Sequence, residues 1–283
     1  MVAGGLSKLA AFFAERAMGG VGLMVTGGIA PNRAGALYPM GTKLTTSREA
    51  RTHKEVTDAV HQHDGKICMQ QVLHAGRYAY HPWAVAPSAV QAPINKFMPT
   101  ALSSADVETT VQDFVRCAML ARDGGYDGVE VMGSEGYLIN QFLVEHTNKR
   151  EDEWGGSYEN RMRFPVSVVE SIRKACGDDF IIIYRLSMVD LIEQGSSWEE
   201  IVKLAKSIEK AGASIINTGI GWHEARIPTI ATSVPRAGFS WVTKKLKGQQ
   251  VKIPLITTNR INMPHTAERV LAEGHADMIS MAR

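Results

Sequence analysis

The sequence has few cysteines and no long hydrophobic run, and these absences exclude several classes of protein. Its 283 residues contain three widely separated cysteines and no Cys-x-x-Cys spacing, so we expect small buried thiols rather than disulfides or metal ligands. No stretch approaches the roughly 18 consecutive apolar residues of a membrane span. The apolar segment Leu6–Ala14 is too short for a signal peptide, because Glu15 and Arg16 follow it. We therefore expect a soluble cytoplasmic protein with no membrane partner.

An excess of one charge and the common phosphate-binding and nucleophile motifs are also missing. The 31 basic residues nearly balance the 29 acidic ones, for a net charge of +2, so we expect no nucleic-acid partner. The absence of Gly-x-Gly-x-x-Gly, Gly-x-x-x-x-Gly-Lys-Ser/Thr and Gly-x-Ser-x-Gly argues against Rossmann, P-loop and α/β-hydrolase sites. The histidines lack neighbouring carboxylates at ligand spacing, so no metal site is predicted.

The chain does contain a repeated alternation of short β-rich apolar runs with amphipathic helical segments. The runs are Val21–Thr26, Lys66–Leu73, Gly128–Met132, Phe180–Leu186, Ser214–Thr218, Pro254–Thr258 and Ala276–Met281. They are apolar throughout rather than at every second residue, which predicts a parallel sheet covered on both faces. No linker composition divides the chain, so we expect a single domain over residues 1–283.

Both a doubly wound sheet and a (β/α)8 TIM barrel fit this alternation. The runs number one fewer than a barrel has strands, the chain opens on a helical segment, and it stops just after a run. We favour a TIM barrel that lacks its first strand and its last helix, which makes this chain a fragment of a longer protein. Such a fragment exposes sheet edges, and we expect marginal stability from it.

In a barrel of this kind the active site lies at the C-terminal ends of the strands. The residues that follow the runs include an arginine, an amide, imidazoles and a phenol, which together suit an anionic or redox cofactor and a carbonyl substrate. They are Gly28, Gln71, Tyr137, His146, Arg185, His223, Glu224, Arg226, Arg260, Ala282 and Arg283.

Several segments resemble the Old Yellow Enzyme family of FMN-dependent barrels. They are QVLHAGR at Gln71–Arg77, GYLINQFL at Gly136–Leu143, TNKR at Thr147–Arg150, DEWGGSYENR at Asp152–Arg161 and SMAR at Ser280–Arg283. The resemblance covers essentially the whole chain, and the long motif after the predicted fourth barrel strand is specific.

The resemblance implies a bound FMN and assigns residues to it. Arg185 and Gln71 would face the flavin pyrimidine edge, and Gly28 would let the backbone approach the ring. Arg260, Ala282 and Arg283 would hold the phosphate, the usual role of the last two strand ends in a barrel. The alternative for Arg185 is an ion pair with a rim carboxylate such as Glu130.

Within this family the chain is most similar to the bacterial NADPH-dependent 2,4-dienoyl-CoA reductases. Typical ene-reductases hold the substrate carbonyl with a histidine and an asparagine or histidine three residues on, where this chain has Met132 and Glu135. The resemblance implies that His223 instead holds the thioester oxygen and that Tyr137 delivers a proton. The substrate-binding residues that it implies are His146, His223, Glu224, Ala225 and Arg226.

The resemblance also implies partners and cofactors outside this chain. The substrate would be an acyl-CoA of unsaturated fatty-acid β-oxidation, and a 4Fe-4S cluster, FAD and NADPH would belong to the missing C-terminal part. The alternatives are a generic FMN ene-reductase acting on enones or nitro compounds, an amine dehydrogenase relative, a non-catalytic flavin-binding barrel, and a phosphate-sugar barrel enzyme without flavin.

Overall fold

The computed structural model describes residues 5–64 and 67–282 and has a parallel sheet at its centre. Its seven strands in the described residues are β1 (Leu23–Val25), β2 (Ile67–Val72), β5 (Gly128–Gly133), β6 (Ile181–Val189), β7 (Ile215–Ile220), β8 (Leu255–Thr257) and β9 (Met278–Ile279). Each overlaps one of the predicted apolar runs, so the predicted strands are confirmed, although β5, β6 and β7 extend past the predicted ends. Lys66, where the second run begins, lies outside the described residues.

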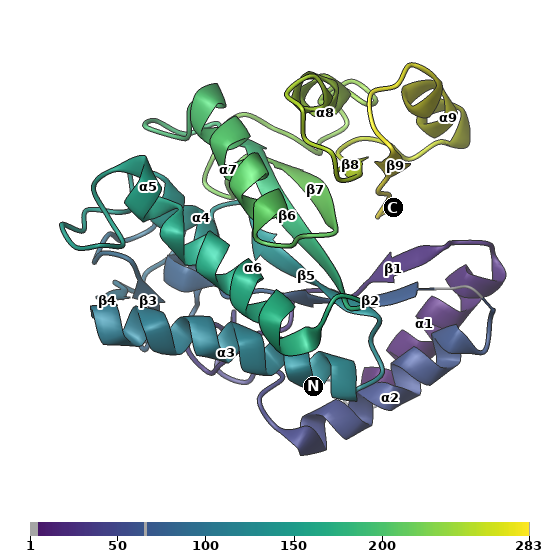
Figure 1. Cartoon of the computed structure of the whole chain (residues 1–283), viewed down its shortest axis with the longest axis horizontal. Helices are drawn as coiled ribbons and strands as arrows, with labels where there is room; N and C mark the ends of the chain where they lie inside the picture. The colour runs from purple at the N-terminus through teal and green to yellow at the C-terminus, as the bar shows by residue number, and fades with distance from the viewer. Residues whose placement is uncertain (1–4, 65–66, 283) are drawn as a thin grey trace.

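The strands follow one another around the sheet in the order β1-β2-β5-β6-β7-β8-β9, and every pair is parallel. This order never reverses, whereas a doubly wound sheet reverses at a switch point. The sheet therefore curls as part of an α/β barrel (Figure 1), and the predicted TIM-barrel class is confirmed. In the described part of the chain, β1 and β9 each have a sheet neighbour on one side only.

Helices connect the strands and cover the outer face of the curled sheet (Figure 1). They are α1 (Gly5–Met18), α2 (Ser47–His61), α3 (Ser104–Asp123), α4 (Leu138–Leu143), α5 (Tyr158–Arg161), α6 (Arg163–Cys176), α7 (Trp198–Lys210), α8 (Ser240–Lys247) and α9 (Pro264–Ala272). A short 3-10 helix, η1 (Gly76–Tyr78), follows β2, and β3 (Val85–Ala86) pairs with β4 (Thr100–Ala101) outside the main sheet.

Side-chain caps fix the starts of the long helices. The N-cap residues of α2, α3 and α7 are Thr46, Ser103 and Ser197, and each forms a capping box with the acidic residue three positions later. Each box satisfies two backbone N–H groups that the first helical turn leaves without partners. At the other end of α3, Gly124 is the C-cap residue.

The apolar face of each long helix packs against the sheet. In α3, Val107, Val111 and Phe114 are buried, as are Ile201 and Leu204 in α7. Full burial of such a side chain contributes about 1.5–3 kcal/mol relative to exposure. The helices thus hold the strands in the curvature that brings the C-terminal strand ends together.

The interior of the curled sheet changes from aliphatic to polar along each strand. The part nearer the N-terminal ends of the strands is filled by an apolar cluster. It consists of Met69, Ile183 and Ile256, joined by Leu23, Val25, Ile67, Ile181, Ile215 and Met278. Alternate residues of a strand point to the same face, so the next inward positions after these are polar. They include Gln71, Glu130, Arg185 and Asn217. This polar layer marks the open end of the barrel.

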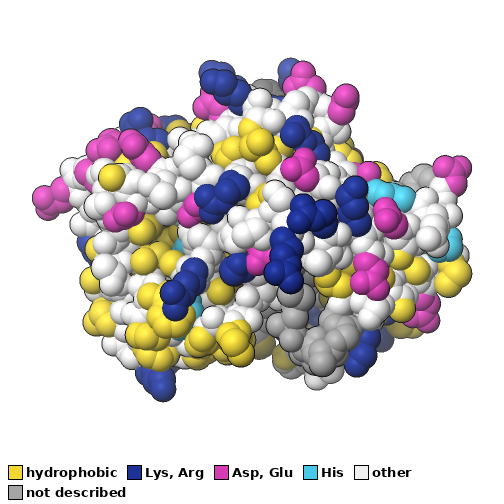
Figure 2. All heavy atoms as spheres, turned by 90° about the horizontal axis from the view of Figure 1, so that it is seen from below, with side chains coloured by type: hydrophobic (Ala, Val, Ile, Leu, Met, Phe, Trp, Pro, Cys, Tyr) yellow, Lys and Arg dark blue, Asp and Glu magenta, His cyan; other side chains and the backbone are white. Residues whose placement is uncertain are grey.

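The outer surface carries charges of both signs. Figure 2 shows basic and acidic side chains interspersed on one face of the molecule, in keeping with the net charge of +2. No helix within residues 5–64 or 67–282 combines the length and apolar content needed to cross a bilayer.

Candidate active site

Glu130 lies at the centre of the polar layer. Its Oε1 accepts a hydrogen bond from Gln71 Nε2 at 2.6 Å, and its Oε2 accepts one from Asn217 Nδ2 at 2.6 Å. Gln71 is the register partner of Glu130, which places the two side chains next to each other. The carboxylate is 1% exposed, so these two donors stabilise a buried charge. Sequence reasoning considered Glu130 only as an alternative ion-pair partner of Arg185 and gave Asn217 no role, although an acid inside an apolar run was a signal.

Arg185 lies in the same layer, on β6 opposite Asn217. Its Nε and Nη2 donate to Glu135 Oε1 at 3.2 and 2.8 Å. The expected alternative partner was Glu130, but the ion pair is formed with Glu135. Burial lowers the pKa of the guanidinium, but the carboxylates of Glu135 and Glu130 raise it further, so the net shift is upward. Arg185 is therefore a fixed cation at the barrel mouth, and its Nη1 has no partner among the described residues.

The turn after β5 aims Tyr137 into the site. Glu135 and Gly136 both have positive φ angles, 54° and 82°. A Cβ atom at Gly136 would lie 2.6 Å from atoms of both Trp222 and Tyr78, so only glycine fits this close approach. The side chain of Ser134 donates to Glu135 Oε2 and holds the turn.

Tyr137 and His223 come together at the C-terminal ends of β5 and β7. The Tyr137 hydroxyl lies 2.9 Å from His223 Nε2, and the two rings pack edge to face at 5.0 Å. Burial and the nearby Glu135 carboxylate raise the pKa of Tyr137 to about 12. Burial lowers the pKa of His223, against the opposing effect of Glu135. At neutral pH the phenol therefore keeps its proton, and the imidazole is neutral with one N–H.

A buried ion pair adjoins this contact through Tyr78, whose ring packs edge to face against both Tyr137 and His223. Arg77 Nη2 donates to Glu224 Oε2 at 2.5 Å, and the Tyr78 hydroxyl donates to the same oxygen at 2.7 Å. The His146 Nε2 atom is 3.8 Å from Glu224 Oε1. The predicted substrate residues His146 and Glu224 are thus neighbours, but the Glu224 carboxylate is already engaged by Arg77, which sequence reasoning assigned no role. The other two, Ala225 and Arg226, are half-buried and exposed, and their binding roles stay predictions.

The residues predicted for the flavin ring come from neighbouring parts of the sheet: Gly28 follows β1, Gln71 lies on β2 and Arg185 on β6, with β5 between the last two. The residue after Gly28 pairs with β2, because Ile29 N donates to the Gln71 carbonyl at 2.9 Å. A Cβ atom at Gly28 would lie 2.7 Å from Leu73 Cδ1, so a side chain there has no space. An exposed glycine backbone, the cation of Arg185 and the Oε1 of Gln71, which accepts no hydrogen bond from the described residues, fit the flat polar edge of a flavin. The residues present are therefore compatible with FMN.

The predicted phosphate residues lie after β8 and β9. Arg260 has a positive φ of 60°, and its Nε donates to the Val234 carbonyl at 3.0 Å. Its own carbonyl accepts from Ala237 N at 3.1 Å. Ala282 is exposed, and Arg283 lies outside the described residues. The phosphate-binding role of all three stays a prediction.

Residues 3–283 match the family described as "NADH:flavin oxidoreductase / NADH oxidase family". The chain belongs to this family. Among curated relatives it is 39% identical over 280 residues to a metal reductase of Desulforamulus reducens, covering 98% of this chain and 42% of that protein. It is 33% identical to an NADH oxidase of Thermoanaerobacter brockii, covering 98% of this chain and 43% of that protein. The chain thus spans less than half the length of these relatives.

Solved structures show the same relationship. A 2-naphthoyl-CoA reductase in complex with 2-naphthoyl-CoA is 31% identical, with a TM-score of 0.91 over 96% of this chain and 44% of that one. An Old Yellow Enzyme homologue from Zymomonas mobilis is 26% identical, with a TM-score of 0.83 over 97% of this chain and 78% of that one. The Old Yellow Enzyme relationship is confirmed, and with it the flavin oxidoreductase class, for which FMN is the expected cofactor.

Proposed function

We propose that this chain is the FMN- and substrate-binding part of an NADPH-dependent reductase that reduces a conjugated C=C bond of a 2,4-dienoyl-CoA thioester. The observation that carries the proposal is the hydrogen-bonded pair of Tyr137 and His223. A CoA thioester substrate is supported by the similar fold of the 2-naphthoyl-CoA reductase in complex with 2-naphthoyl-CoA.

Two residues occupy the positions where typical ene-reductases bind the substrate carbonyl, and their chemistry supports a substrate other than a simple enone. Met132 is 5% exposed and packs in an apolar cluster with Leu73. Glu135 is occupied by Arg185 and Ser134 and as a carboxylate can only accept hydrogen bonds. Neither residue offers a donor to a carbonyl oxygen, so the donor must come from another loop. His223 is such a donor.

The roles of Tyr137 and His223 follow from where negative charge develops on the substrate during the reaction. When bound, reduced FMN would supply the hydride for the terminal carbon of the diene, so negative charge would develop on the thioester oxygen. A donor aimed at that oxygen lowers the barrier. With the Tyr137 hydroxyl donating to His223 Nε2, the imidazole N–H at Nδ1 is left to bind the oxygen. The Tyr137 hydroxyl then rotates to the substrate and protonates the carbon chain, a step worth about 10²–10⁴-fold in rate.

The longer relatives contain further chain that this sequence does not match, and groups that deliver electrons to the FMN can belong to that part. The chain covers 42–44% of the metal reductase and of the 2-naphthoyl-CoA reductase. We propose that the whole protein carries electrons from NADPH through FAD and a 4Fe-4S cluster outside this chain to the FMN, and that it serves unsaturated fatty-acid β-oxidation.

Anaerobic single-turnover kinetics on the full-length protein test the proposal. The flavins are first released by denaturation and identified, and the intact protein is then reduced with dithionite and mixed with one acceptor at a time. Rapid flavin reoxidation by 2,4-hexadienoyl-CoA, with slow reoxidation by 2-cyclohexenone and a nitroalkene, is the expected result. Faster reoxidation by the enone or the nitroalkene shows a generic ene-reductase instead, and flavin reduction by sarcosine shows an amine dehydrogenase.

A further inference from the structure

Asp190 is a buried carboxylate at the end of β6 that the proposed chemistry does not use. It is 3% exposed and its hydrogen-bond donors are all neutral. They are Ser187 Oγ at 2.6 Å, Trp222 Nε1 at 2.8 Å and Asn140 Nδ2 at 3.3 Å on Oδ1, and the backbone N of Ser196 at 2.7 Å on Oδ2. A buried charge is stable only where hydrogen-bond donors surround it. The donors around Asp190 belong to several loops and turns, which the carboxylate therefore holds in place.

One set of contacts holds the segment that carries His223. The Trp222 indole donates to the Asp190 carboxylate, and the Trp222 backbone N donates to the Asp190 carbonyl at 2.9 Å. The preceding Gly221 N donates to the Val189 carbonyl at 2.7 Å. Trp222 directly precedes His223, so Asp190 fixes the loop after β7 at the residue next to the predicted donor.

A second set holds the turn that carries Tyr137. Asn140 donates to Asp190 through Nδ2, while its Oδ1 accepts from the Gly136 backbone N at 3.0 Å. Gly136 directly precedes Tyr137. The same carboxyl oxygen of Asp190 is therefore bonded to the side chains that anchor both members of the Tyr137–His223 pair.

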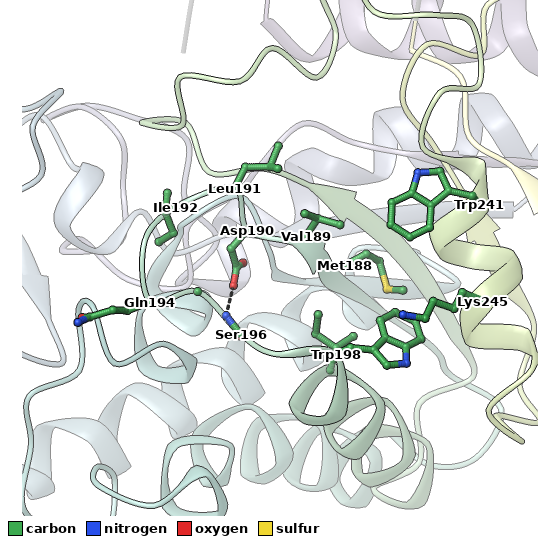
Figure 3. Close-up of a pocket in the computed structure, with 12 residues that line it drawn as sticks. Met188, Val189, Asp190, Leu191, Ile192, Gln194, Ser196, Trp198, Trp241 and Lys245 are labelled. Carbon is green, nitrogen blue, oxygen red and sulfur yellow. Dashed lines mark hydrogen bonds between the residues drawn. The ribbon is translucent and has the colours of Figure 1, made fainter.

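The loop after Asp190 is also held by this carboxylate. Leu191 and Gln194 have positive φ angles of 60° and 55°, a conformation that such residues adopt only when the surroundings enforce it. Asp190 Oδ2 accepts from Ser196 N across this loop, and the loop lines a pocket of about 480 Å³ next to α7 and α8 (Figure 3). A Cβ atom at Gly195 would lie 2.9 Å from the Asp190 Cβ, which shows how closely the loop folds over the carboxylate.

We infer that Asp190 is the positioning residue of this site, which holds the loop after β7 and the turn after β5 so that Tyr137 and His223 stay in contact. Its catalytic consequence rests on the proposed function. A carboxylate suits the task because its two oxygens accept all four hydrogen bonds, whereas an asparagine amide has one acceptor oxygen. In an asparagine at this position, Oδ1 would still accept the three hydrogen bonds. Its NH2 group, however, would face the Ser196 N–H, so two donors would meet and that hydrogen bond would be lost.

The test compares two substitutions in the full-length, FMN-loaded protein. In Asp190→Ala both anchors are released, and we expect flavin reoxidation by 2,4-hexadienoyl-CoA to slow by about 100-fold, the effect of a displacement near 1 Å. In Asp190→Asn the Trp222 and Asn140 contacts survive, so we expect a loss of about tenfold or less. The FMN dissociation constant stays unchanged in both.

Asp127→Asn is the matched control. Asp127 also accepts a backbone hydrogen bond, from Cys68 N at 2.7 Å, and a side-chain contact from His61 at 2.8 Å. It lies at the opposite end of the strands, so its loss lowers stability without moving the rim. Equal losses of rate in Asp127→Asn and Asp190→Ala would overturn the positioning role.

A double-mutant cycle with His223→Ala separates positioning from general damage. If Asp190 acts through His223, the further rate loss on adding Asp190→Ala to His223→Ala is at least about fivefold smaller than in the parent protein. Hydrogen–deuterium exchange supplies a readout without turnover, because peptides that contain Gly136 and Gly221–Trp222 should exchange faster in Asp190→Ala and not in Asp127→Asn. Additive rate losses together with unchanged exchange would overturn the inference.

Failure of the proposed function looks different from failure of the inference. If Tyr137→Phe and His223→Ala retain full reoxidation rates, the proposed function is wrong, and the exchange result alone decides whether Asp190 holds the two segments. If those two variants are slow while Asp190→Ala keeps the parent rate, the proposed function stands and the positioning role is overturned.

Discussion

The hydroxyl of Tyr137 and Nε2 of His223 lie 2.9 Å apart although 86 positions separate them in the chain. Each residue lies on a loop that leaves the C-terminal end of a strand, Tyr137 after β5 and His223 after β7. The two strands are separated by β6 in the sheet, and Asp190 at the end of β6 is bonded to the anchors of both loops. The contact therefore depends on the order of strands around the barrel.

Replacing Tyr137 with phenylalanine should leave FMN bound and slow reoxidation of the reduced flavin by the dienoyl-CoA by about 100-fold or more, because the substituted ring carries no proton to donate. Single-turnover absorbance of the flavin measures this directly. Since the pKa of Tyr137 is raised to about 12, the parent rate should show no loss attributable to this phenol up to about pH 10.

Tyr80→Phe is the control for that variant. Tyr80 is an exposed tyrosine whose hydroxyl donates to the backbone carbonyl of Ile94 at 3.3 Å. Its substitution should change neither rate nor flavin content. An unchanged rate in Tyr137→Phe would remove Tyr137 from the mechanism.

Replacing Arg185 with alanine should weaken FMN binding, because the flavin loses its cation and Glu135 is left without its ion-pair partner. A charge-assisted hydrogen bond contributes about 1.5–3 kcal/mol, which corresponds to an increase of about 10- to 100-fold in the FMN dissociation constant. Fluorescence titration of the apoprotein with FMN measures it. Arg185→Lys keeps the charge and should lose less affinity, and equal affinity in parent and alanine variant would contradict a flavin contact.

Replacing Gly28 with alanine should lower FMN affinity, because the new Cβ lies 2.7 Å from Leu73 Cδ1 and narrows the barrel mouth. Overpacking of this kind costs about 1–3 kcal/mol. Gly28→Ala combined with Leu73→Gly removes the clash, because the Leu73 Cβ also lies 2.9 Å from the new atom. If the flavin must approach the glycine backbone, FMN titration of the double variant still shows weak binding, whereas recovery to the parent affinity would make the glycine a packing residue only.

Replacing Glu49 with glutamine should reduce the stability of the fold at neutral pH. Burial raises the pKa of Glu49, but hydrogen bonds from Lys43 and from Thr45 outweigh it and hold the pKa at about 2. A folded-state pKa below the ordinary 4.5 means that this stabilisation is complete above pH 4.5 and is lost as the pH falls towards 2. Glu49→Gln should therefore cost about 2–3 kcal/mol at pH 7.

Urea unfolding followed by circular dichroism at several pH values checks the Glu49 prediction. The difference from the parent protein should shrink as the pH falls from 4.5 towards 2. Glu55→Gln, an exposed position on the same helix, should show no such difference. A stability difference that stays constant over this range would show that the effect of Glu49→Gln is not electrostatic.

Local chemistry explains why much of the architecture could be predicted. The predicted apolar runs overlap all seven strands, because the burial pattern of a strand depends on residues a few positions apart. The helices α4 and α5 were not predicted. Both are short, at six and four residues, and α4 is buried on all sides, so neither shows an amphipathic pattern.

The sequence alone determined the order of the seven strands, favoured the barrel class and gave most of the polar residues at the strand ends. Only the tertiary structure decided which of those residues meet. It paired Arg185 with Glu135 instead of Glu130, placed Glu130 between Gln71 and Asn217, and joined Arg77 to Glu224 across 147 positions. These contacts depend on strand register and loop path, which are set by packing over the whole sheet and leave no pattern in any short stretch of sequence.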